Sequence, residues 1–71
     1  MSGRKPCSLV VPRHDRAVLQ TIARSDSLPW YQVRRARIVL AIAAGQRVQT
    51  IALHLQCDPA TVWRTCQRYT H

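Results

Sequence analysis

Two apolar repeats separated by a short turn, in the segment 48–67, constrain the fold of this chain more than any other feature. Ile51 and Leu55 mark the first repeat at helical spacing, and Val62 and Cys66 mark the second, which continues to Tyr69 just beyond the segment. Ala52 is small enough to let a second helix approach closely, and Cys57 falls in the turn. The pattern predicts a helix-turn-helix, in which two short helices share one buried seam.

The second helix of this motif has a start signal of its own. Asp58 can accept hydrogen bonds from the free backbone N–H groups of a first helical turn. Pro59 follows at the first helical position, where its missing N–H costs nothing. We therefore expect this helix to begin at Pro59, with the Asp58 side chain as its cap.

Prolines and one glycine predict two supporting helices before the motif. Pro12 is placed to open a helix that runs to about Arg24. Pro29 opens a second helix that ends near Ala44, where Gly45 suits the left-handed position that follows many helices. The residues expected on the inner faces of these two helices are Val18, Leu19, Ile22, Ala23, Val33, Ala36, Leu40 and Ala43.

The second supporting helix has two unusual features. Ile38, Val39 and Ile42 make its second half apolar almost all round, so it either lies at the centre of the bundle or faces a partner. Trp30 and Tyr31 stand at its start, and we expect them to pack against the first helix rather than to stack on bases.

The charge of the chain is strongly asymmetric. Lysine and arginine together number 11, ten of them arginine, against three aspartates, which gives a formal net charge of +8. Arginine binds phosphate and guanine edges through two parallel hydrogen bonds. The composition therefore favours a polyanionic partner, and with a helix-turn-helix this is double-stranded DNA, although such charge also serves solubility alone.

A chain of 71 residues forms one small domain. We expect 1–11 to be a basic flexible arm and 12–71 to be the helix-turn-helix domain. In the arm, Arg4 and Lys5 suit a minor-groove contact, or form a solvated basic terminus.

Two sets of residues in the domain are predicted to contact DNA. The candidates for reading base edges, on the exposed face of the last helix, are Pro59, Ala60, Thr61, Trp63, Arg64 and Gln67. The candidates for binding the phosphate backbone are Arg34, Arg35, Arg47, Gln49, Thr50 and Arg68. Arg64 and Gln67 have the side chains that pair bidentately with guanine and adenine. The arginines of the second supporting helix, Arg37 included, equally suit a solvated face.

We expect no catalytic, cofactor, metal or membrane-spanning role. Residue types that bind zinc occur at His54, Cys57, Cys66 and His71. Their spacing does not match a zinc site. The three cysteines have no disulfide-like spacing, which favours a reducing cytoplasm. The longest apolar run, 38–44, is too short to span a membrane.

Particular residues between about 33 and 69 follow the order of a known family. They are Arg35, Ala36, Arg37, Ile38, Val39, Leu40, Gly45, Ile51, Ala52, Thr61, Val62, Arg64, Arg68 and Tyr69. In these residues the chain resembles the N-terminal DNA-binding region of bacterial insertion-sequence transposases of the mariner-related superfamily. The resemblance implies a homeodomain-like fold that recognises terminal inverted repeats.

The same resemblance implies a separate catalytic domain, in which three carboxylates hold two metal ions. The acids of this chain, Asp15, Asp26 and Asp58, lie in a small helical domain and do not suit that role. We therefore expect a non-catalytic domain, either part of a longer transposase or a free-standing protein derived from one.

Three residues depart from the family's pattern. Gln56 stands in the turn where the family usually has glycine, and a side chain in left-handed backbone costs about 1 kcal/mol. Arg47 stands where a serine would cap the first helix of the motif. Thr65 replaces a tryptophan in the seam. We expect these changes to affect stability and activity more than fold.

The sequence therefore predicts an all-α, four-helix, homeodomain-like domain that binds a specific sequence of double-stranded DNA. A stand-alone transcription regulator is a close alternative with a different target. An alternative from another class is a self-associating interaction module, such as a homodimer built on the apolar segment 38–44.

Overall fold

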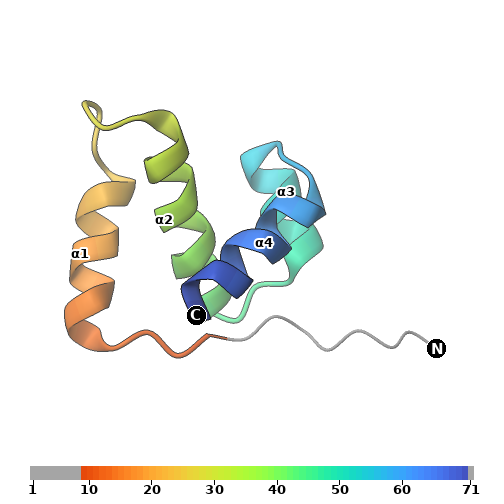
Figure 1. Cartoon of the computed structure of the whole chain (residues 1–71), viewed down its shortest axis with the longest axis horizontal. Coiled ribbons are helices and arrows are strands. Elements are labelled where there is room, and N and C mark those ends of the chain that lie inside the picture. The colour runs from red at the N-terminus through yellow and green to blue at the C-terminus, as the bar shows by residue number, and fades with distance from the viewer. Residues whose placement is uncertain (1–8, 71) are drawn as a thin grey trace.

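The computed structural model describes residues 9–70, which contain four α-helices and no strand (Figure 1). The helices are α1 (Arg13–Ala23), α2 (Trp30–Ala43), α3 (Val48–Leu55) and α4 (Pro59–Thr70). Figure 1 shows α1 alongside α2, with the α3–α4 pair on the other side of α2. The predicted all-α, four-helix fold is confirmed.

The end of α2 follows from the glycine that the sequence supplies there. Gly45 has a φ of 91°. Its N–H donates to the carbonyl of Ile42 at 2.9 Å, and the N–H of Gln46 donates to the carbonyl of Ala41 at 3.1 Å. These two bonds form a Schellman motif, which satisfies carbonyls that the helix itself leaves free.

The turn between α3 and α4 repeats this arrangement with glutamine in place of glycine. Gln56 has φ 55° and ψ 48°, in the left-handed region. Its N–H donates to the carbonyl of Leu53 at 3.3 Å, and the Cys57 N–H donates to that of Ala52 at 3.0 Å. The turn therefore carries the cost of a side chain in left-handed backbone, about 1 kcal/mol.

The start of α4 differs from the expected one in its cap. The amides of Thr61 and Val62 donate to the backbone carbonyl of Asp58, at 3.0 and 3.4 Å. The Asp58 carboxylate accepts no hydrogen bond from the residues described. The predicted side-chain cap is therefore wrong, and Pro59 reduces the need for one because it contributes no N–H donor.

Among the described helices, α2 is central: it packs against α1, α3 and α4, whereas α1 packs against α2 alone. The buried core consists of Leu9, Val11, Ala36, Ile38, Val39, Ile42, Ile51, Ala52, Val62 and Cys66. Ile38, Val39 and Ile42 are buried inside the chain, so these three side chains are not available to a dimer interface on the segment 38–44. The homodimer itself stays a prediction.

The packed part of the chain begins before the predicted boundary. Leu9 and Val11 are buried in the core, while Val10 between them is exposed. This alternation is typical of extended backbone, in which successive side chains point to opposite sides. The segment 9–11 thus belongs to the domain rather than to a flexible arm. Residues 1–8, with Arg4 and Lys5, lie outside the described residues.

The inner face of α1 is only partly covered, because among the described helices α2 alone packs against it. Leu19, Ile22 and Ala23 are half-buried, as the predicted stripe requires. Val18, expected in the same stripe, is exposed. In residues 9–70 no helix has both the length and the apolar character that crossing a membrane requires.

Candidate nucleic-acid interface

α4 turns a polar face away from the core. Val62 and Cys66 are buried one helical turn apart and anchor the helix against α2 and α3. Positions on the opposite side of a helix are then left outside. The exposed residues of α4 include Pro59, Ala60, Arg64, Gln67 and Arg68. Four of the six residues predicted to read bases thus lie on an accessible surface.

The other two predicted base-reading residues, Thr61 and Trp63, lie at the sides of this face. Both are half-buried, because each is rotated by only about 100° from the buried Val62. The Thr65 hydroxyl donates to the Thr61 carbonyl at 2.9 Å. The expectation of an exposed Trp63 is wrong.

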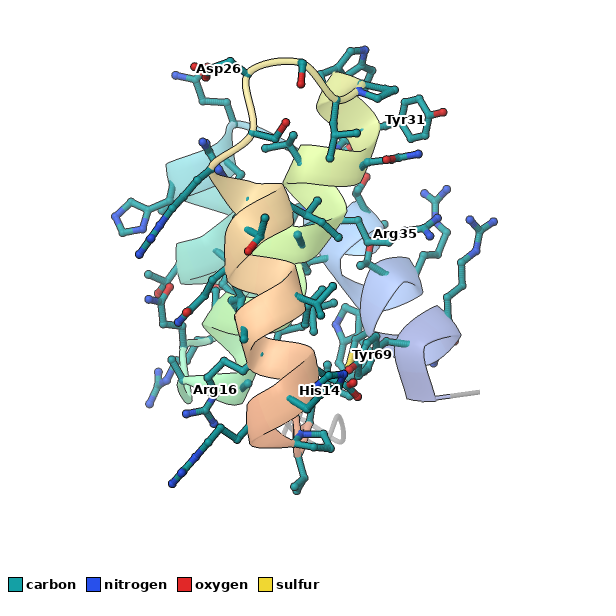
Figure 2. The ribbon with its side chains drawn as sticks, turned by 90° about the vertical axis from the view of Figure 1, so that its left-hand side faces the viewer. His14, Arg16, Asp26, Tyr31, Arg35 and Tyr69 are labelled. Atoms are coloured by element: carbon teal, nitrogen blue, oxygen red, sulfur yellow. The ribbon has the colours of Figure 1, made fainter. Side chains whose placement is uncertain are left out.

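The most distinctive surface is a cavity between α2 and α4, which we call the arginine groove. Its volume is about 270 Å³, and its lining residues are Tyr31, Arg34, Arg35, Thr61, Arg64, Thr65 and Arg68. Figure 2 shows Tyr31 and Arg35 extending from α2 on the side where α4 lies. The groove brings together three of the predicted phosphate-binding arginines, Arg34, Arg35 and Arg68, with the predicted base-reading Arg64.

The electrostatic character of the arginine groove follows from its lining. Four guanidinium groups border it, and none of the described residues around it is acidic. Like charges that border one cavity repel one another unless an anion lies between them. Guanidinium groups match phosphate oxygens with two parallel hydrogen bonds. The groove is therefore suited to bind phosphate groups.

A second surface lies where α3 begins. Arg47, Gln49 and Thr50 are exposed there, as a phosphate-binding role requires. Arg47 precedes the helix in extended backbone, and its side chain makes no capping hydrogen bond, as predicted. Gln49 and Arg34 line one cavity of about 900 Å³ that also borders the start of α4. Arg34 thus connects this surface to the arginine groove.

Arg37, another arginine of α2, does not line the arginine groove and has a structural role. Its Nε and Nη2 atoms both donate to the carbonyl of Ala23, each at 3.3 Å. Ala23 is the last residue of α1, where helical carbonyls have no partner within the helix. The side chain therefore fastens the end of α1 to α2.

Trp30 and Tyr31 differ from prediction, because neither packs into the space between α1 and α2. Both are exposed. Their rings are perpendicular, with centroids 6.3 Å apart and an interplanar angle of 86°. The Arg34 guanidinium carbon lies 4.6 Å from the centroid of the Trp30 ring. Their position at the first turn of α2 explains the exposure, since α1 has already ended at Ala23.

The described residues contain no group of three or more His, Cys, Asp or Glu side chains that could hold a metal ion. Cys57 and Cys66 are free thiols, half-buried and buried respectively. His71, the fourth residue weighed for zinc, lies outside the described residues.

The arginine groove was not visible in the sequence because it forms only where α2 and α4 cross. A local signal was nevertheless present on each helix. Tyr31 with Arg35, and Arg64 with Arg68, stand four residues apart, so each pair lies on one face of its helix. What the sequence did not show is that these two faces meet.

Comparison with known proteins agrees with this architecture. A family model described as a homeodomain-like domain matches residues 30–71, more than half of the 71-residue chain. The match covers α2, α3 and α4 and leaves α1 outside. No curated protein and no solved structure matches the chain. The chain belongs to the family of homeodomain-like helix-turn-helix domains, a class whose presence suggests DNA as the partner.

Proposed function

We propose that this chain binds a specific sequence of double-stranded DNA, with α4 in the major groove and the arginine groove against the adjacent phosphates. The observation that carries the proposal is the convergence of four arginines beside the exposed face of α4. The major groove of B-DNA is about 12 Å wide and admits an α-helix. In this placement Arg64 and Gln67 reach base edges, while Arg34, Arg35 and Arg68 neutralise phosphates.

The start of α3 completes the proposed contact. In helix-turn-helix proteins the first helix of the motif crosses the DNA backbone. Backbone N–H groups at a helix start favour an anion, and Arg47, Gln49 and Thr50 are exposed beside them. The minor-groove contact of Arg4 and Lys5 belongs to the same proposal.

The proposed target is the terminal inverted repeat of a mobile element, bound by this domain without catalysis. Support comes from the resemblance between residues 33 and 69, which overlaps the homeodomain-like match at 30–71. The acids are also dispersed: Asp15 is in α1, Asp26 follows α1, and Asp58 precedes α4. Their separation favours a binding role.

Selection from a pool of random duplexes, at several salt concentrations and followed by sequencing, tests this proposal. Each phosphate contact lowers the logarithm of affinity by about 0.9 per unit of log salt. We expect an enriched motif that persists near physiological salt. Binding without enrichment that disappears as salt rises would contradict a sequence-specific role.

The position of the enriched motif in genomic DNA distinguishes a terminal inverted repeat from the binding site of a transcription regulator. Inverted copies at both ends of a repeated element are expected for a transposase domain. Single or palindromic copies upstream of genes would instead identify a stand-alone transcription regulator. Incubation of the bound duplex with Mg²⁺ tests the absence of catalysis, since we expect no strand cleavage or joining.

A further inference from the structure

The two aromatic residues that begin α2 are largely exposed, although burying their rings would stabilise the domain. Trp30 is 68% exposed and Tyr31 is 52% exposed. Aromatic rings are normally the largest contributors to a small core, and this chain has only two tryptophans and two tyrosines. Two of these four rings therefore stand side by side on the surface instead of contributing to the core.

The two rings are held in a defined arrangement. Tyr31 meets Trp30 edge to face, at 86° and 6.3 Å between centroids. The guanidinium group of Arg34 lies over the Trp30 ring, with its carbon atom 4.6 Å from the ring centroid. A cation over an aromatic face is attracted by the electrons of the ring. Arg34 thus orients Trp30 and places a positive charge next to it.

This aromatic pair continues the arginine groove. Tyr31 lines the groove itself. Trp30 lines a neighbouring cavity of about 400 Å³, within the range of roughly 300–1,000 Å³ typical of small-ligand sites. Arg34 lines both cavities. Any strand that follows the arginines toward the start of α2 therefore reaches the rings next.

We propose that Trp30 and Tyr31 form a stacking platform for an unpaired base of a DNA strand whose phosphates follow the arginine groove. Positive charge beside aromatic rings is the combination with which proteins bind single-stranded nucleic acid. The charge of the groove favours this occupant over an apolar protein surface. The inference rests on the proposed function in one respect, namely that the strand continues from the bound duplex.

The first test compares duplexes that carry the selected site and end in a short single-stranded tail. One tail has adenine bases and the other has abasic sites, so that both supply the same phosphates. Both tail polarities are used. We expect the adenine tail to bind about five- to hundredfold more tightly than the abasic tail. Equal affinities for the two tails would overturn the platform.

Variants then identify the residue responsible. In Trp30→Ala the preference for adenine over the abasic tail is expected to disappear, while Trp30→Phe, which keeps a ring, retains part of it. Val18→Ala is the matched control, because Val18 is an exposed apolar residue on α1, outside the groove. Circular dichroism establishes that each variant keeps its helices. A preference that survives in folded Trp30→Ala would overturn the assignment.

A second measurement separates failure of the platform from failure of duplex binding. Single-stranded oligonucleotides with adenines or with abasic sites are titrated without any duplex. Tighter binding of the adenine strand, lost in Trp30→Ala, supports the platform even if no duplex is bound. Equal binding of both strands, together with specific duplex binding, overturns the platform and leaves the proposed function intact.

Discussion

Gln56 has a left-handed backbone conformation, which glycine adopts more easily than a residue with a side chain. Among the described residues it is the one non-glycine residue with a positive φ, and it is exposed. Gln56→Gly is expected to stabilise the domain by about 0.5–1 kcal/mol, after allowing for the greater freedom of glycine in the unfolded chain. Thermal unfolding checks this, since 1 kcal/mol corresponds to about 4–8 °C in a domain of this size.

Gln46→Gly is the control for that prediction. Gln46 is also exposed and also follows a helix, but its φ is not positive. Glycine at this position relieves no strain and adds only unfolded-state freedom, so a lower melting temperature is expected. Equal shifts in both variants would show that the left-handed backbone of Gln56 is not the source of the gain.

Arg37 and Arg35 lie two residues apart on α2, and we expect the first to stabilise the fold and the second to bind DNA. Arg37 holds the Ala23 carbonyl, so Arg37→Gln is expected to lower the free energy of unfolding by about 1 kcal/mol. Arg35→Gln removes the same charge from the arginine groove, and is expected to leave unfolding almost unchanged while weakening DNA binding. Urea unfolding and a DNA titration of each variant check the two roles. The reverse pattern would contradict both assignments.

Arg64 has two potential functions, because it is exposed on α4 and also lines the arginine groove. If it reads a guanine, Arg64→Ala costs about 1–3 kcal/mol at the preferred site and relaxes the preference at one base pair. Repeating the duplex selection with the variant measures this. An equal loss on every sequence would make Arg64 a phosphate contact like Arg35.

At the level of the element, α3 combines a weak start with a predicted DNA contact. Its preceding residue Arg47 makes no capping bond. Arg47→Ser supplies a cap and is expected to raise stability by about 1 kcal/mol. The same change removes a predicted phosphate contact, so DNA affinity falls and its salt dependence becomes shallower by about 0.9.

Arg47→Ala separates these two effects. It removes the cation without supplying a cap, so the loss of affinity is expected to match that of Arg47→Ser while the gain in stability is absent. Melting curves and titrations at several salt concentrations give both quantities. Unchanged affinity in both variants would exclude Arg47 from the DNA surface.

The helix boundaries were predictable because short-range chemistry sets them. Pro12, Pro29 and Pro59 start helices through their fixed φ, and Gly45 ends one through its positive φ. The inward placement of Val62 and Cys66 follows equally from helical period. Each of these features needs only a few neighbouring residues.

Features that depend on tertiary structure could not be read in the same way. Leu9 and Val11 enter the core only because the extended segment passes under the helices. Trp30 stays exposed because α1 ends before it reaches that ring. For the candidate site, the sequence indicated the residue types and the exposed face of α4, while their convergence on one groove required the crossing of α2 and α4.

At the level of the whole molecule, the position of the charge matters more than its sum. The formal net charge is +8, yet the cations lie on different sides. Arg13 and Arg16 belong to α1, which contacts α2 alone among the helices and lies away from α3 and α4 (Figure 1). Arg35 of α2 and Arg68 of α4 both line the arginine groove. Charge on the far side of a small domain still attracts DNA over a distance, but it forms no contact that releases counterions.

Two double variants of equal charge test this view. Arg35→Gln with Arg68→Gln and Arg13→Gln with Arg16→Gln each remove two positive charges. Because each lost phosphate contact changes the slope by about 0.9, the first pair is expected to make the log–log salt dependence shallower by about 2. The second pair is expected to leave the slope nearly unchanged and to slow association slightly at low salt. Equal slopes in the two double variants would mean that net charge, rather than the arginine groove, holds the DNA.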